Sequence, residues 1–263
     1  MPCPYICYCG AFTRFRLRYS SIKARVFIVD QHQANSTGGL ARWAVQITTM
    51  TLITGIILFT AAGRMDWAGG WAFLGLNIFT QSLSALILSR RQPDLLGERS
   101  RVGGQATKGW DRFLAAAITI FGTLTMIVVA GLDARLAWSQ NIPTAIWWGA
   151  LLICLASQLF VLWAMATNRF FTTTVCIQEE RGHQVVDTGP YGLVRHPGYT
   201  GSVVYTLLIP LVLGSYWTYI PATVTVILLV ARTALEDRIL QEELPGYKEY
   251  AKNVPHRLFP GVW

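Results

Sequence analysis

Residues able to do chemistry are concentrated in two short blocks of this sequence. The first block ends in residues 189–199, which hold two prolines, two tyrosines, an arginine and a histidine among glycines that permit turns. A segment of this composition suits holding a ligand more than filling a hydrophobic core. We therefore take residues 178–199 as one half of a candidate site.

The second block is residues 232–250, in which Arg232 and Glu236 stand four positions apart and so share one face of a helix. An intrahelical salt bridge is the simplest interpretation, but it would contribute only about 0.3 kcal/mol. It also does not explain why ionisable groups begin directly after the apolar run 217–230. Ionisable groups at the end of a membrane span indicate a functional site.

The elements that position these blocks are apolar helices. A chain of 263 residues with 52% hydrophobic and 14% charged residues exposes more apolar surface than one soluble core of that size can bury. Crossing a bilayer takes about 20 apolar residues. The sequence therefore predicts an all-α integral membrane protein with about six transmembrane helices, at residues 43–62, 67–89, 113–132, 144–166, 199–213 and 217–230.

The last two runs are short, and we expect them to form a closely packed helical hairpin that brings the two polar blocks together. Residues 232–243 then form an amphipathic helix that leaves the membrane and ends at Pro245 and Gly246.

The distribution of basic residues predicts the orientation. Of the 22 Lys and Arg residues, all but Arg64 and Arg135 fall on one side of these spans. Basic residues stay on the cytoplasmic side of short loops, so both termini and the polar segment 167–197 are expected in the cytoplasm. The net charge of +8 therefore reflects membrane topology, and no nucleic-acid partner is predicted.

Residues 1–42 form a basic N-terminal arm in this prediction. They have no apolar core followed by a cleavage site, so a secretory signal is not expected. A juxtamembrane arm, a start placed too far upstream and an organelle-targeting segment all remain open. Cys3, Cys7 and Cys9 are closely spaced but have no fourth ligand nearby, so no metal site is predicted.

Several positions together resemble the isoprenylcysteine carboxyl methyltransferase family. They are residues 189–199, Arg232 with Glu236 and Asp237, and Gly246, Tyr247 and Tyr250 ahead of Val254 and Pro255. The resemblance covers roughly the last 90 residues. The Arg-His-Pro-x-Tyr element also occurs in phospholipid methyltransferases and, more loosely, in membrane sterol reductases that use NADPH. Here Glu236-Asp237 replaces the usual Glu-Glu, which keeps both carboxylates.

The resemblance implies an S-adenosylmethionine-dependent methyltransferase with residues 43–166 as a four-helix transmembrane scaffold and residues 167–263 as the catalytic region. Arg232 would face the acceptor carboxylate. The residues implied to bind the cofactor are Gln178, His183, Gln184, Val185, Val186, Tyr191, His196, Pro197, Gly198, Tyr199 and Glu236.

The acceptor is expected to be lipophilic and to enter from the bilayer, among membrane lipids. A carboxylate is already a nucleophile at pH 7, so its methylation needs orientation and desolvation but no general base. A phospholipid amine would instead have to lose a proton, for which His196 or Glu236 is available. A prenylated cysteine, a smaller isoprenoid acid, a phospholipid and a xenobiotic all remain compatible with the sequence.

Two other functions remain open. An NADPH-dependent reductase of a sterol or isoprenoid shares the Arg-His-Pro-x-Tyr element, but the acidic residues at 236–243 disfavour the 2′-phosphate of that cofactor. A non-enzymatic membrane protein or transporter would need no cofactor.

Overall fold

In a computed structural model, which describes residues 43–92, 109–172 and 182–263, all regular secondary structure is helical. The elements are the helix Trp43–Ala62, α2 (Ala68–Arg91), α4 (Gly109–Thr119), the π-helical segment η1 (Ile120–Thr125), α5 (Met126–Leu136), α6 (Thr144–Thr167), the 3₁₀ turn η3 (Gly189–Gly192), α7 (Pro197–Leu213), α8 (Tyr219–Glu243) and α9 (Tyr247–Asn253). The all-α prediction is thereby confirmed.

Five of the described helices are long and apolar enough to cross a membrane, and they include the continuous helix Gly109–Leu136 formed by α4, η1 and α5. The fifth predicted span, residues 199–213, corresponds to α7, a shorter apolar helix of 17 residues. The last predicted span and the amphipathic helix after it form one helix, α8, of 25 residues. No glycine or proline interrupts α8 after Pro221, so the helix continues from apolar into polar sequence without a break.

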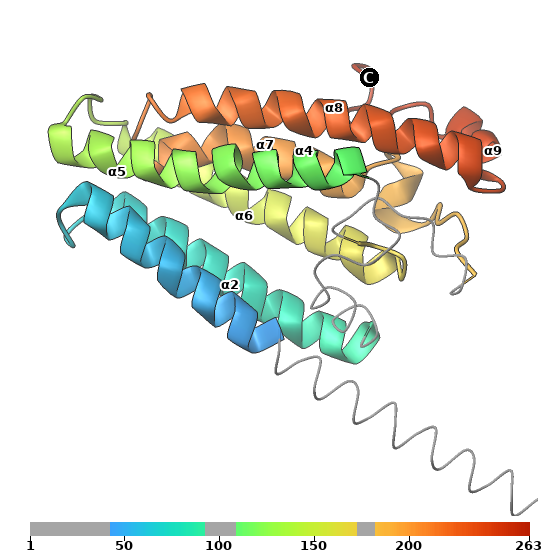
Figure 1. Ribbon diagram of the computed structural model, residues 1–263, viewed down its shortest axis with the longest axis horizontal. Coiled ribbons are helices and arrows are strands. Elements are labelled where there is room, and N and C mark those ends of the chain that lie inside the picture. The colour runs from blue at the N-terminus through green and yellow to red at the C-terminus, as the bar shows by residue number, and fades with distance from the viewer. Residues whose placement is uncertain (1–42, 93–108, 173–181) are drawn as a thin grey trace, which may run out of the picture.

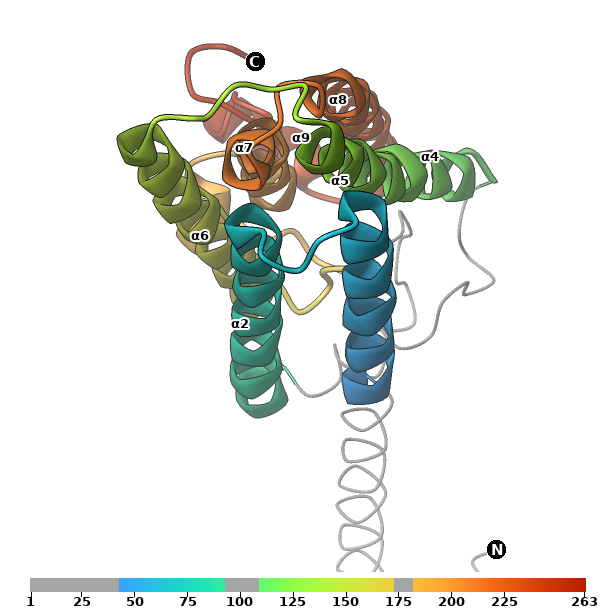
Figure 2. The same cartoon turned by 90° about the vertical axis from the view of Figure 1, so that its left-hand side faces the viewer.

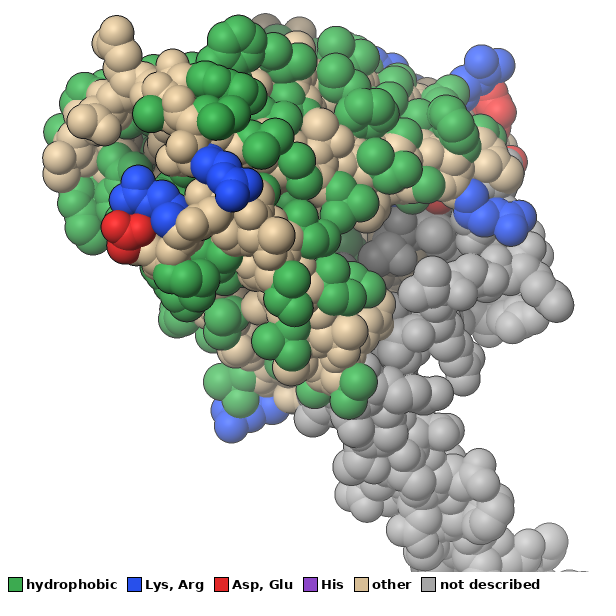
Figure 3. Space-filling model, turned by 60° about the vertical axis from the view of Figure 1, so that its left-hand side comes forward, with side chains coloured by type: hydrophobic (Ala, Val, Ile, Leu, Met, Phe, Trp, Pro, Cys, Tyr) green, Lys and Arg blue, Asp and Glu red, His purple; other side chains and the backbone are tan. Residues whose placement is uncertain are grey.

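The surface of the helices agrees with an integral membrane protein. Large apolar side chains such as Leu52, Ile56, Leu152 and Ile227 are exposed. Figure 3 shows hydrophobic side chains spread across the described part of the visible face, with few charged side chains among them. Lipid would cover this apolar surface.

Helix α7 lies at the centre of the bundle. It packs against α6, α8, α2 and α5, and the view along the helices in Figure 2 shows it among them. Close packing of α6 and α7 depends on Gly201, because a Cβ atom there would lie 2.7 Å from the carbonyl oxygen of Ser157. The buried core around α7 includes Ile209, Val212 and Leu213.

The polar blocks 189–199 and 232–250 meet at one end of the bundle, where α8 extends past the start of α7 and α9 follows it (Figure 1). The prediction that an intervening hairpin brings them together is confirmed, since Tyr199 binds Glu236 and Arg195 binds Asp237. The C-terminal segment joins them, because the backbone N–H groups of Arg195 and His196 donate to the carbonyls of His256 and Arg257.

Candidate active site

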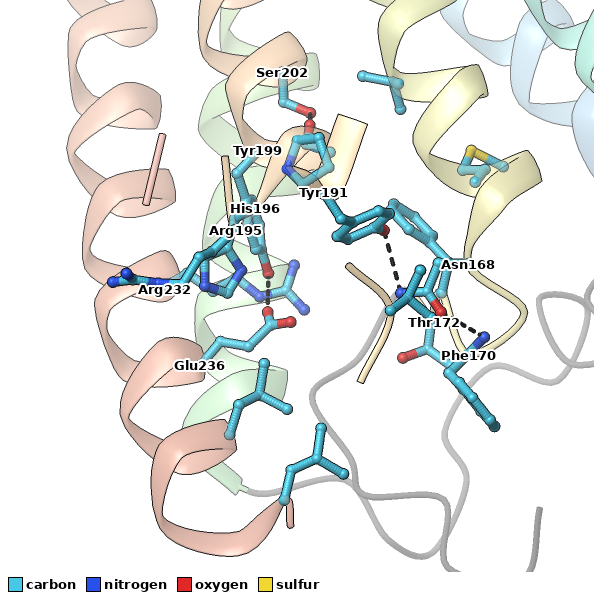
Figure 4. A pocket seen from close by; sticks show the side chains of 18 of the residues that line it. Asn168, Phe170, Thr172, Tyr191, Arg195, His196, Tyr199, Ser202, Arg232 and Glu236 are labelled. Carbon is cyan, nitrogen blue, oxygen red and sulfur yellow. Dashed lines mark hydrogen bonds between the residues drawn. The ribbon is translucent and has the colours of Figure 1, made fainter. Parts of the chain in front are cut away.

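A cavity of about 450 Å³ opens where the two polar blocks meet. Its volume is within the range of roughly 300–1,000 Å³ that small-molecule sites occupy. The cavity is bounded by α4, α6, α7 and α8, and by the segments between α6 and α7. Figure 4 shows Arg232 and Glu236 on one side of it, and Tyr191, Asn168 and Phe170 on the other.

The structure places the sequence-predicted residues that it describes around this single cavity. These are His183, Gln184, Val185, Val186, Tyr191, His196, Pro197, Gly198, Tyr199, Arg232 and Glu236. Gln178 lies outside the described residues. The roles of these residues in binding and catalysis stay predictions.

Glu236 and Tyr199 connect α8 to the first turn of α7. The hydroxyl of Tyr199 donates a hydrogen bond of 2.6 Å to a carboxylate oxygen of Glu236, as Figure 4 shows. The guanidinium carbon of Arg232 lies 5.7 Å from the centre of the Tyr199 ring, within cation–π range. Tyr199 therefore contacts both Glu236, which is predicted to bind the cofactor, and Arg232, which is predicted to bind the acceptor.

Arg232 is held by a residue that sequence reasoning did not include. Its Nε and Nη2 donate to the two carboxylate oxygens of Asp111 on α4, at 2.7 and 3.2 Å. The simplest sequence interpretation, a salt bridge from Arg232 to Glu236 on the same helix, is therefore not what orients the guanidinium. Asp111 stands 121 positions earlier in the chain. The sequence feature that could have identified Asp111 is an ionisable residue directly ahead of an apolar span.

Asp237 joins the chain segments behind the cavity. Its carboxylate is fully buried and accepts bonds from Arg195, at 2.8 and 3.2 Å, and from Arg257, at 2.8 Å. His196 Nε2 lies 3.2 Å from the same carboxylate, and Tyr247 donates to it at 3.1 Å. Asp237 thus positions Arg195 and His196, which line the cavity.

Two tyrosines near the cavity remain protonated hydrogen-bond donors. Burial, with the neighbouring charge of Asp237, raises the pKa of Tyr247 well above its ordinary value. Burial likewise raises the pKa of Tyr250, whose hydroxyl donates to the carbonyl of Tyr191 at 2.7 Å. Because Tyr250 bonds the backbone of η3, it fixes the turn that carries Tyr191.

Aromatic rings form the wall opposite α8. Asn168 Nδ2 donates to the hydroxyl of Tyr191 at 3.2 Å, and its Oδ1 accepts from the backbone N–H of Phe170 at 2.8 Å. The rings of Phe170 and His183 lie 4.5 Å apart and are tilted by 30°. Sequence reasoning missed Asn168 and Phe170, because they precede the first polar block. This wall offers π faces to a ligand.

The remaining wall of the cavity is apolar. It contains Ile118 from α4, Val161 and Met165 from α6, and Leu229 and Leu240 from α8. Among the residues that the structure describes, no group of three His, Cys, Asp or Glu side chains could hold a metal ion. The cavity therefore combines a charged edge, an aromatic wall and an apolar wall.

The chain is similar to several known proteins. Residues 150–244 match the model of the Isoprenylcysteine carboxyl methyltransferase (ICMT) family. The chain is 25% identical over 162 residues to "Uncharacterized protein YpbQ" of Bacillus subtilis, which covers 61% of this chain and 95% of that protein.

Two further relatives match over shorter regions. Protein-S-isoprenylcysteine O-methyltransferase B of Arabidopsis thaliana is 30% identical over 115 residues, 41% of this chain and 58% of that protein. Delta(14)-sterol reductase TM7SF2 of Mus musculus is 35% identical over 85 residues, 31% of this chain and 20% of the reductase. The chain therefore spans less than two thirds of these two relatives.

Among solved structures, the eukaryotic intramembrane Ras methyltransferase ICMT matches with a TM-score of 0.51 and 15% identity, over 94% of this chain and 87% of that one. At this identity the match shows the fold. Together with the family-model match over residues 150–244, it confirms the resemblance to the isoprenylcysteine carboxyl methyltransferase family seen in the sequence.

Proposed function

We propose that this protein is an integral membrane methyltransferase that uses S-adenosylmethionine to methylate the carboxylate of a lipophilic acceptor. The observation that carries the proposal is one cavity in which Glu236, the aromatic wall and Arg232 face an apolar lining. The family match over residues 150–244 supports it.

The donor groups of the cavity fit S-adenosylmethionine, which carries an ammonium, a carboxylate, ribose hydroxyls and an adenine. Glu236, oriented by Tyr199, would accept hydrogen bonds from the ammonium or the ribose. Tyr191 and His183 would offer their ring faces to the adenine or the sulfonium. Residues 183–186 and 196–199 would complete the site. When bound, the cofactor supplies a methyl group made electrophilic by its sulfonium.

Arg232 would bind the acceptor carboxylate through guanidinium N–H groups other than the two that bind Asp111, because a guanidinium carries five N–H donors. The acceptor oxygen is ionised at neutral pH, so no general base is needed. Orientation by Arg232 and exclusion of water by the apolar wall would therefore supply most of the rate enhancement.

The acceptor would enter from the bilayer, and the cofactor from the cytoplasm. In this orientation both termini would lie on the cytoplasmic side, as the distribution of basic residues predicts. Residues 167–263 would form most of the catalytic region. Residues 43–166 would form the scaffold and would also contribute the cavity residues on α4 and α6.

A second candidate is an NADPH-dependent reductase, which the similarity to the mouse sterol reductase favours. Each arginine that lines the cavity faces an aspartate, Arg195 facing Asp237 and Arg232 facing Asp111. The two paired arginines therefore bring too little positive charge for a 2′-phosphate, which carries a charge of about −1.5 to −2. An acceptor carboxylate carries only one negative charge, which N–H groups of Arg232 that do not bind Asp111 would bind. For this reason we prefer the methyltransferase.

Calorimetric titration of the detergent-purified protein with S-adenosylhomocysteine, and separately with NADPH, tests the proposal. Saturable binding of S-adenosylhomocysteine alone is expected, with weaker binding by Glu236→Ala. Glu242→Ala, an exposed position on the same helix, should bind like the wild type.

Methyl transfer to a panel comprising an S-prenylated cysteine, an isoprenoid acid and a phospholipid then identifies the acceptor. Binding of NADPH alone would favour the reductase, and binding of neither would overturn both enzymatic functions.

A further inference from the structure

The ion pair of Asp111 and Arg232 connects α4 to α8 beside the cavity. The Asp111 carboxylate is fully buried, and the Arg232 side chain is 11% exposed. Both carboxylate oxygens are used, in the two-point geometry that a guanidinium and a carboxylate prefer. This contact fixes both the plane and the direction of the guanidinium.

Glu236 is the partner that the helix itself would offer to Arg232. An Arg–Glu pair four residues apart forms readily on an isolated helix. In this protein, Arg232 Nε binds Asp111 on another helix, and Glu236 accepts the hydroxyl of Tyr199. These two contacts take the place of a salt bridge between Arg232 and Glu236, and they direct the two side chains to different partners.

The separation matters for the proposed chemistry. If Arg232 turned onto Glu236, each group would neutralise the other, and the cavity would lose both its cation for the acceptor and its anion for the cofactor. We propose that Asp111 is a positioning residue for methyl transfer, which holds Arg232 toward the acceptor and away from Glu236. This inference rests on the proposed function.

The same helix also forms part of the cavity that would receive the acceptor. Ala115, Ile118 and Thr119 of α4 line the cavity about one to two turns after Asp111. Asp111 therefore sets the position of the cation relative to the apolar wall against which the acceptor would lie.

A second contact holds α4 and α8 at a fixed separation. In η1, the π-helical continuation of α4, Gly122 packs so closely on Thr225 of α8 that a Cβ atom would lie 2.9 Å from the Thr225 methyl group. The two helices are thus joined by an ion pair near the cavity and by a glycine contact farther along. Such rigid support is what a group held in a catalytic orientation requires.

Substitution of Asp111 separates a positioning role from a purely structural one. In Asp111→Asn, kcat for methyl transfer should fall by about tenfold or more, because a small displacement of an orienting group costs this much. The KM for the acceptor should stay within about threefold, and so should the affinity for S-adenosylhomocysteine measured by calorimetry. A structural role would lower the yield of folded protein without changing kcat per folded molecule.

Asp111→Glu keeps the charge and the ion pair, so it tests the proposal if Asp111→Asn does not fold. Its carboxylate reaches one methylene farther and would displace the guanidinium of Arg232, so kcat should fall below that of the wild type. A wild-type kcat in folded Asp111→Glu, or a loss of cofactor affinity equal to the loss of kcat, would overturn the positioning role. Failure of the wild type to bind S-adenosylhomocysteine would instead refute the proposed function, so the two failures are distinguishable.

Discussion

Asp237 and Arg195 form a buried two-point ion pair, with Nε to Oδ1 at 2.8 Å and Nη2 to Oδ2 at 3.2 Å. The pair joins α8 to the segment before α7. Arg195 also donates to the carbonyl oxygens of Val254 and Pro255 at 2.8 and 2.9 Å, so the C-terminal segment depends on the same side chain. One aspartate therefore connects α8, the segment before α7 and the C-terminal segment.

Asp237→Asn should lower the free energy of unfolding by about 3–5 kcal/mol, because it leaves a buried arginine without its counter-charge. Denaturant titration of the protein in detergent micelles, monitored by circular dichroism, measures the change. Asp66→Asn is the matched control, since Asp66 forms an exposed ion pair with Arg64 and its removal should leave stability unchanged. Equal stabilities of the two variants would contradict this prediction.

The helices were predictable from hydropathy alone. The run 43–62 and the run starting at Thr144 coincide with described helices to within a residue or two. The π-helical turn at η1 was not predictable, because its residues are apolar and differ little from their α-helical neighbours. The helix at residues 232–243 was predicted as an amphipathic helix leaving the membrane, and α8 includes it. The burial of Thr233 and Asp237 on this part of α8 was not predicted, because it depends on packing in the folded protein.

The candidate site was predictable where its residues stand close in the sequence. The meeting of residues 189–199 with residues 232–250 followed from the short connection between two apolar runs. Asp111 could not be assigned to Arg232, because a separation of 121 positions leaves its partner open to many topologies. Asp237 lies behind the cavity and not in it. This position depends on how α8 is rotated about its own axis, which the sequence of α8 does not specify.

Tyr199→Phe should weaken the binding of S-adenosylhomocysteine by about tenfold. The substitution removes the 2.6 Å hydrogen bond that orients Glu236, and a bond to a charged group contributes roughly this much. Isothermal titration calorimetry measures the affinity. Tyr205→Phe on the same helix is the control, because its hydroxyl accepts from Asn77 away from this cavity. Equal affinities for the two variants would remove the Tyr199 hydroxyl from cofactor binding.

Gly201→Ala should destabilise the protein by about 1–3 kcal/mol, the usual cost of overpacking. The new methyl group would lie 2.7 Å from the Ser157 carbonyl oxygen, and this backbone atom cannot move without separating α6 from α7. Gly149→Ala on α6 has no heavy atom within 4 Å of the new methyl group and should be tolerated. Thermal unfolding in the same detergent compares them, and a tolerated Gly201→Ala would show that α6 and α7 separate easily.

Arg232→Lys should reduce kcat/KM for methyl transfer by roughly 100-fold while leaving the affinity for S-adenosylhomocysteine within about twofold. A lysine keeps the positive charge, but its single ammonium cannot hold Asp111 at two points and also orient an acceptor carboxylate. The loss would therefore report geometry and not charge. Arg238→Lys, at an exposed position on the same helix, should react at the wild-type rate. If Arg232→Lys also reacts at that rate, the guanidinium fork has no part in orienting the acceptor, and the carboxylate must be held by another group in the cavity.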